Sequence, residues 1–79
     1  MPLNIRLSST LRKYVPGYDP AKGVDLSLDK GTTVAAVCMH MNIPAEKVKI
    51  IMINGKSESL DYQLKGNERI GLFPPVGGG

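Results

Sequence analysis

Among the residue types that commonly carry out chemistry, cysteine and histidine each occur once in this sequence, as Cys38 and His40. Cys38 falls within an apolar stripe, which favours a buried thiol, and no second cysteine or suitably spaced base supports a nucleophile. His40 lies beside that stripe, where a solvated surface position is the simplest interpretation. One cysteine, one histidine and scattered acids do not have the spacing of a metal site, so no metal ligand is assigned. The side chains therefore predict no catalytic centre within this chain.

The end of the chain is its most unusual feature, with the sequence Pro74-Pro75-Val76-Gly77-Gly78-Gly79. The two prolines are stiff and extended, and should hold the last residues away from the folded domain. The three glycines have no side chains, so they fit a narrow channel and are expected to be flexible. Residues 75–79 would reach about 16–18 Å, with the carboxylate of Gly79 at the tip. Such an arm is suited to delivering a carboxylate into another protein's active site; on composition alone, the alternative is a disordered tail or a cloning remnant.

Composition limits the class of protein. At 79 residues, with 42% hydrophobic and 22% charged residues, the chain is expected to be one globular domain, too small to enclose a large active site. The net charge of +3 comes from ten bases spread along the chain and aromatic residues are 5%, which argues against nucleic-acid binding. No membrane span and no secretory signal are visible. The single cysteine favours a reducing, cytoplasmic location.

Five strands are expected, at residues 3–8, 24–29, 48–53, 56–58 and 69–73. The first two show strict alternation of apolar and polar residues, which is typical of half-buried strands. The third is apolar on both faces over its last four residues, so a partner or another element must cover its second face. Asn54-Gly55 predicts a type I′ hairpin turn, and Pro74-Pro75 should end the last strand.

One main helix is predicted from the apolar spacing of Val34, Val37, Cys38 and Met41, which places these residues on one helix face. Thr32 or Thr33 is the expected N-cap, and the helix should end at Asn42 because the residue after it precedes a proline. A shorter helix is expected over residues 11–15. This order of elements predicts an α+β fold in which the main helix packs across a single face of one mixed sheet.

Taken together, these segments resemble the MoaD/ThiS family of ubiquitin-like sulfur carriers, and most closely the small subunit of molybdopterin synthase. The similarity covers nearly the whole chain. The most specific motif joins the last strand to a double proline and a glycine pair. Gly77 stands where the family often has Ser, Ala or Thr, and Asn67 where it usually has Asp. The motifs are Ile5-Arg6-Leu7 with Leu11-Arg12, Lys30-Gly31-Thr32-Thr33-Val34, Ile53-Asn54-Gly55, Leu64-Lys65-Gly66-Asn67-Glu68-Arg69-Ile70 and Phe73-Pro74-Pro75-Val76-Gly77-Gly78-Gly79.

The resemblance implies a β-grasp domain over residues 1–75 and a flexible glycine tail over residues 76–79. It also implies that the chain is not a catalyst alone. An E1-like adenylating enzyme of the MoeB, ThiF or HesA type would use ATP and magnesium to convert the Gly79 carboxylate to an acyl-adenylate. A sulfur donor would then replace AMP and leave a thiocarboxylate, while residues 74–78 thread the tail into each partner. The large subunit of molybdopterin synthase, of the MoaE type, would use this sulfur to build the dithiolene of a molybdenum or tungsten cofactor. No cofactor is expected to stay bound to the chain itself.

The expected docking surface is the sheet face that the main helix leaves open. Ile70 and Leu72 share one face and are assigned to the core, which places Phe73 on the open face together with Ile51 or Ile53. An exposed apolar cluster of this kind usually marks an interface. In the resembling family, this region meets both the adenylating enzyme and the synthase large subunit.

Other functions remain open beside cofactor synthesis. One is a ubiquitin-like modifier that is joined to lysines through Gly79, and another is a ThiS-like carrier for thiamine thiazole synthesis. The double proline disfavours the ThiS branch, which usually lacks it. The tail residues do not separate a carrier from a modifier, because both would use the same adenylated end. A β-grasp interaction module without terminal chemistry is the third alternative.

Overall fold

The computed structural model describes residues 2–75, and the predicted flexible tail over residues 76–79 lies outside this range. Within it, the sequence forms five strands, one α-helix and two short 3-10 helices, written η. The elements are β1 (Pro2–Leu7), η1 (Ser9–Tyr14), β2 (Val24–Ser27), α1 (Val34–His40), η2 (Ala45–Lys47), β3 (Ile50–Ile53), β4 (Lys56–Glu58) and β5 (Arg69–Phe73).

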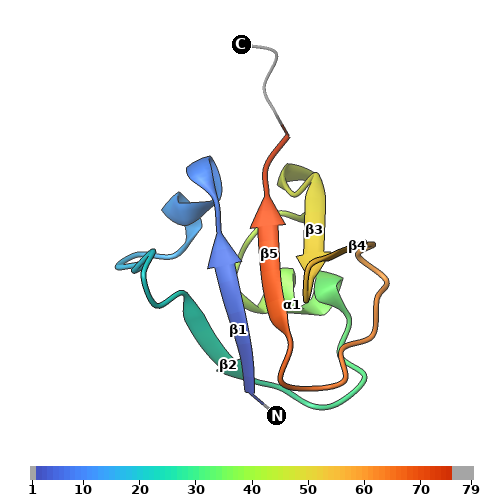
Figure 1. Ribbon diagram of the computed structural model, residues 1–79. Coiled ribbons are helices and arrows are strands. Elements are labelled where there is room, and N and C mark those ends of the chain that lie inside the picture. The colour runs from blue at the N-terminus through green and yellow to red at the C-terminus, as the bar shows by residue number, and fades with distance from the viewer. Residues whose placement is uncertain (1, 76–79) are drawn as a thin grey trace.

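The five strands form one mixed sheet in the order β2-β1-β5-β3-β4 (Figure 1). The central pair, β1 and β5, is parallel, with Ile5 opposite Ile70 and Leu7 opposite Leu72. The other three pairs are antiparallel. Because β5 has a hydrogen-bonded neighbour on each side, the last strand is held more firmly than an edge strand. The α+β architecture predicted from the sequence is confirmed.

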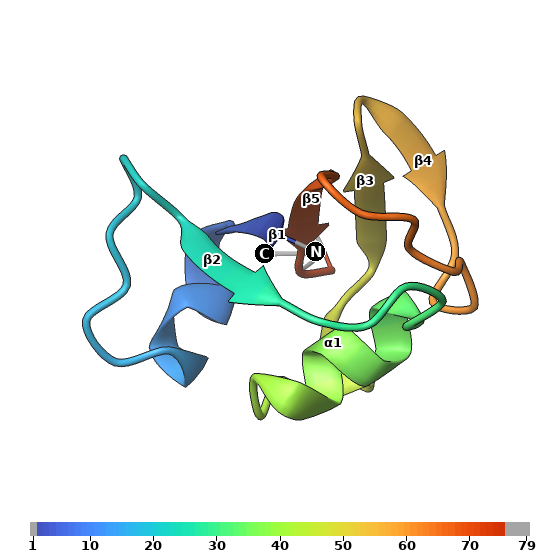
Figure 2. The same ribbon diagram turned by 90° about the horizontal axis from the view of Figure 1, so that it is seen from below.

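The core lies between the sheet and α1, which packs on one side of it (Figure 2). Val34, Val37 and Cys38 of α1 are fully buried, as the apolar spacing predicts. Burying a valine side chain stabilises a fold by about 1.5–3 kcal/mol. The buried side chains of the sheet that face α1 are Leu3, Ile5, Leu7, Ile51, Ile53, Ile70 and Leu72.

Both ends of α1 have a local cause. At its start, the Thr33 hydroxyl accepts a hydrogen bond from the Ala36 N–H at 3.2 Å, which confirms Thr33 as the N-cap. At its end, Asn42 takes a left-handed backbone conformation with φ of 61°, and the Ile43 N–H bonds to the Cys38 carbonyl at 2.8 Å. This is the Schellman arrangement, in which Asn can replace the usual glycine. The helix therefore ends close to the expected position, through a cap formed by Asn42 itself.

The face assignment of Ile51 and Ile53 was wrong. Both are buried, with 4% and 3% of their surface exposed, whereas Ile50 is 42% exposed. The reason is the pairing with β5, where Ile51 lies opposite Leu72 and Ile53 opposite Ile70. Paired residues share a sheet face, so both isoleucines join the helix-covered core. Ile50 and Met52 take the open face instead.

Some predicted boundaries also differ. The third strand begins at Ile50 and not at residue 48, because the preceding segment forms η2 and the Val48 N–H bonds back to the Ala45 carbonyl. The segment predicted as a short helix over residues 11–15 is the 3-10 helix η1. The hairpin turn is confirmed, since Asn54 and Gly55 have φ of 51° and 86°, as a type I′ turn requires.

Candidate functional site at the end of strand β5

The chain leaves the sheet at the end of β5, its central strand. The Lys49 N–H donates to the Phe73 carbonyl at 2.8 Å, and the Ser8 N–H donates to the Leu72 carbonyl at 3.2 Å. Backbone bonds from residues next to β1 and β3 thus hold β5 up to its last residue, Phe73. Pro74 and Pro75 have no N–H group to continue either ladder. The sheet therefore fixes the position from which residues 76–79 continue.

The exit point lies between the two 3-10 helices. Figure 1 shows η1, in blue, and η2, in yellow, on either side of the end of β5. A groove runs between them, and its lining includes Lys13 and Tyr14 of η1, Lys47 of η2, and both prolines. The predicted tail residues come directly after Pro75 in the sequence and lie outside the described residues; they are Val76, Gly77, Gly78 and Gly79.

An apolar patch on the open sheet face adjoins the exit. We define the open-face patch as Ile50, Met52, Gly71 and Phe73. Phe73 and Ile50 lie opposite each other and are 37% and 42% exposed. The exposed position of Phe73 is as predicted, but its apolar neighbour is Ile50. Sequence reasoning missed Ile50 because its face depends on which residue of β5 it meets.

The two reactive side chains are not brought together into a site. Cys38 is fully buried in the core, and burial raises the pKa of its thiol. His40 is exposed on α1. Within residues 2–75, no group of three or more His, Cys, Asp or Glu side chains is placed to hold a metal ion. The described part of the chain also contains no helix long and apolar enough to cross a membrane.

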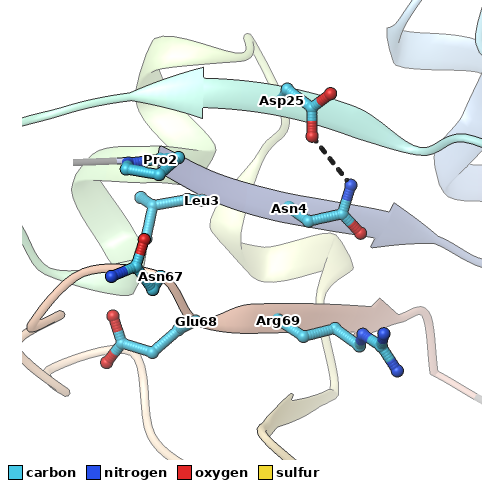
Figure 3. A pocket seen from close by; sticks show the side chains of 7 residues that line it. All are labelled: Pro2, Leu3, Asn4, Asp25, Asn67, Glu68 and Arg69. Carbon is cyan, nitrogen blue, oxygen red and sulfur yellow. Dashed lines mark hydrogen bonds between the residues drawn. The ribbon is translucent and has the colours of Figure 1, made fainter.

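A second hollow lies at the opposite end of β5 (Figure 3). The buried Glu68 carboxylate there accepts hydrogen bonds from the Lys65 N–H at 2.9 Å and from the Gly66 N–H at 2.7 Å. The Asn4 side chain donates to Asp25 at 3.0 Å. Glu68 and Arg69 point in opposite directions in the close-up view. These polar groups bond to other parts of the chain, and the bonds of Glu68 stabilise the turn at residues 65–68. The hollow therefore does not present converging polar groups to a ligand.

A mixed five-stranded sheet that carries one main helix on one face and releases the chain from its central strand defines the ubiquitin-like β-grasp class. The profile of the ThiS family matches residues 11–79. Because this match covers most of the chain, the protein belongs to the ThiS family of ubiquitin-like sulfur carriers and modifiers. Carriers of this type are non-catalytic subunits that work with E1-like adenylating enzymes and partner subunits.

Solved structures support the same fold at low sequence identity. Small archaeal modifier protein 1 (SAMP1) of Haloferax volcanii is 18% identical over the full length of both chains, with a TM-score of 0.71. A Pyrococcus furiosus protein assigned as molybdopterin converting factor, subunit 1, is 19% identical, with a TM-score of 0.72 over 96% of this chain and 99% of its own. The H. volcanii HVO 2177 protein is 24% identical, with a TM-score of 0.74 over 100% of this chain and 87% of its own. No curated protein matches the sequence.

Proposed function

We propose that this protein carries sulfur for the synthesis of a molybdenum or tungsten cofactor, as the small subunit of a molybdopterin synthase. In this proposal Gly79 is the C-terminal residue. Its carboxylate attacks the α-phosphorus of ATP and releases pyrophosphate, and a sulfur donor then displaces AMP from the acyl carbon. The product is a thiocarboxylate. ATP, magnesium and the catalytic groups belong to the adenylating enzyme.

The family match that extends through Gly79 carries this proposal. The anchored end of β5 supports it, because an arm that delivers its tip into a channel needs a fixed base. From Pro75, the four remaining residues can reach about 13 Å when extended. This length suffices for the carboxylate to enter a partner's active site while the folded domain stays outside.

The open-face patch supplies the docking surface in this proposal. Its exposed aromatic and aliphatic side chains, Phe73 and Ile50, lie directly beside the exit of the tail. Aromatic residues near the centre of an interface often carry much of the binding energy. Contact at this patch would align the tail with the partner's channel.

The molybdopterin pathway is the finer part of the proposal. It is supported by the double proline at Pro74 and Pro75, which resembles the molybdopterin synthase small subunit, and by the fold shared with the P. furiosus protein assigned as a molybdopterin converting factor subunit. The large subunit of the synthase would then be the second partner that binds the tail.

The test is reconstitution with the ThiF- or MoeB-type adenylating enzyme of the same organism, ATP, magnesium and sulfide, followed by intact mass spectrometry. Replacement of one oxygen by sulfur at Gly79 is the expected result. A variant with one residue added after Gly79 is the control, and it should keep its thermal stability but lose adenylation. Adenylation of that variant, or none of the wild type, would contradict the terminal-carboxylate mechanism. Transfer of the sulfur to a pterin precursor by the synthase large subunit would then identify the pathway.

Protein modification is a second candidate, since the fold is shared with small archaeal modifier protein 1 of H. volcanii. It would use the same acyl-adenylate, with a lysine amine and not sulfur as the acceptor. Mass spectrometry of the protein from its native host separates the two functions, because conjugates at lysine indicate a modifier and a terminal thiocarboxylate indicates a carrier. The match to the ThiS family also favours a test with thiazole synthase as the enzyme that uses the sulfur.

A further inference from the structure

The net charge of the protein is concentrated at the end where the chain leaves the sheet. Residues 12–13 in η1 and residues 46–49 in and after η2 carry four bases and one acid. The remaining six bases and six acids of the chain cancel. The formal charge of +3 for the whole chain is therefore the charge of this end alone.

Three lysines lie near the exit, and we define Lys13, Lys47 and Lys49 as the lysine collar. Lys13 and Lys47 line the groove that also contains Pro74 and Pro75. Lys49 follows η2 and bonds through its backbone to Phe73, the last residue of β5. All three residues are exposed. The collar therefore lies next to the base of the segment that the proposed function sends into a partner.

Arg12 is basic but has a different role. Its Nε donates to the Leu7 carbonyl at 3.1 Å, and its guanidinium lies 5.7 Å from the centre of the Tyr18 ring. These contacts join η1 to β1 and to the following loop. Lys13, in contrast, has its ammonium 5.4 Å from the centre of the Tyr14 ring, which orients the charge without neutralising it.

Within residues 2–75 none of the collar lysines forms an ion pair, and the one acid in these segments, Glu46, leaves their charge in excess. Like charges that lie close together repel each other, so the collar does not stabilise the fold. An acidic surface on a partner would attract the three lysines and offset the repulsion between them. A nucleic acid fits less well, since a single-strand surface needs several stacking aromatics, and within residues 2–75 Phe73 is the one aromatic side chain that is exposed, at 37%.

We propose that the lysine collar docks against an acidic rim around the channel of the adenylating enzyme that receives the tail. This inference rests on the proposed function and specifies the chemistry of the partner. The collar and the open-face patch have different roles in recognition. The lysines accelerate the association with the adenylating enzyme and orient the tail, and the apolar patch stabilises the complex once it has formed. Contacts between exposed charges are screened over about 8 Å at physiological salt, so the collar's contribution should depend strongly on ionic strength.

The test compares two triple variants with the same change of charge. The collar variant carries Lys13→Glu, Lys47→Glu and Lys49→Glu. The matched control carries Lys30→Glu, Lys56→Glu and Lys65→Glu, three exposed lysines toward the opposite end of the sheet. Steady-state adenylation by the cognate enzyme is measured for each protein at low and at high salt, with circular dichroism as the check of folding. A set of Lys→Gln replacements at the collar provides a milder variant if the reversed charges disturb η1 or η2.

The collar variant is expected to lose at least about tenfold in kcat/KM at low salt, with kcat preserved and the difference shrinking as salt rises. The control should stay close to the wild type. Equal effects of the two variants, with the wild type adenylated normally, would overturn the collar and leave the proposed function intact. Absence of adenylation in every protein would overturn the proposed function and the collar with it. Binding of duplex DNA or transfer RNA that the collar variant alone loses, with adenylation unchanged, would identify a nucleic-acid surface and also overturn the inference.

Discussion

The ring of Phe73 lies along the open sheet face over Gly71, with its Cε1 atom 3.3 Å from the position that a Cβ would occupy on that glycine. The two residues are two positions apart in β5 and therefore share a face. Gly71 has no positive φ, so its backbone would accept any residue. A glycine inside a central strand normally weakens the strand. Its use here is to leave room for the aromatic ring.

Replacing Gly71 by alanine should therefore weaken partner binding without harming the fold. The new Cβ would lie 3.3 Å from the ring, closer than an ordinary contact, so the ring must shift by a few tenths of an ångström. We expect the free energy of unfolding to change by less than about 1 kcal/mol, since alanine restricts the unfolded chain more than glycine does. The ring-proton chemical shifts of Phe73 and the affinity for the adenylating enzyme test this. Ser57→Ala on β4, which is separated from β5 by β3, is the control, and unchanged affinity in both variants would show that the ring position is irrelevant.

Phe73→Ala tests the open-face patch directly. The side chain is 37% exposed, so its removal should cost much less stability than the about 3–5 kcal/mol of truncating a buried phenylalanine. Affinity for the adenylating enzyme should fall by at least about 1–2 kcal/mol, as for a central aromatic contact. Both quantities are measured on the same variant, by urea unfolding and by titration calorimetry.

Met39→Ala provides the control for that experiment. Met39 is a large apolar side chain on α1 that is 77% exposed, and it is not part of the open-face patch. It should change neither stability nor affinity appreciably. If it weakened binding as much as Phe73→Ala does, the docking surface would be on the helix side of the molecule.

The error at β3 shows where the sequence stops being informative. Alternation in residues 3–8 identifies the buried face because polar residues mark the other one. Residues 50–53 are all apolar, so the same period-2 argument has two equally good solutions. The choice is made by the antiparallel register with β5, which places Ile50 opposite Phe73 and Ile51 opposite Leu72. That register is a tertiary contact between segments far apart in the chain.

Neighbouring residues 50 and 51 therefore provide a test of this register. Ile51→Ala should reduce the free energy of unfolding by about 2–5 kcal/mol, because it opens a cavity in the core. Ile50→Ala should cost far less stability and should instead weaken partner binding. Denaturant unfolding and binding are measured for both. The opposite pattern would mean that β3 is shifted by one residue.

Features with local causes were predictable, and those assembled by the sheet were not. The Thr33 cap and the Asn54-Gly55 turn are confirmed because each depends on a few neighbouring residues. Lys13 and Lys47 are far apart in sequence and border one groove only because β1 and β3 flank β5. In the linear sequence, the ten bases look evenly spread. The lysine collar follows from strand order, which no local pattern encodes.

Stability should fall in alkaline solution through Cys38. Desolvation by burial raises the pKa of this thiol above its ordinary value of 9.0. The unfolded chain then loses its thiol proton at a lower pH than the folded protein does, so rising pH favours unfolding from about pH 9 up to the folded pKa. The slope from one such group is at most about 1.4 kcal/mol per pH unit. Below pH 8 the thiol is protonated in both states, and the full contribution is present.

Cys38→Ala isolates this component of the pH dependence. The variant will be less stable at neutral pH, because alanine leaves part of the core unfilled, but the alkaline decrease due to the thiol should disappear from its curve. The pKa of Tyr62 is also raised, first by desolvation and then by the nearby charges of Glu68 and Glu58, and it adds a loss of the same sign at higher pH. Since Tyr62 is present in both proteins, its effect cancels in the difference between the two curves. Urea unfolding from pH 7 to 10 under reducing conditions gives that difference, and parallel curves over the whole range would contradict a buried protonated thiol at position 38.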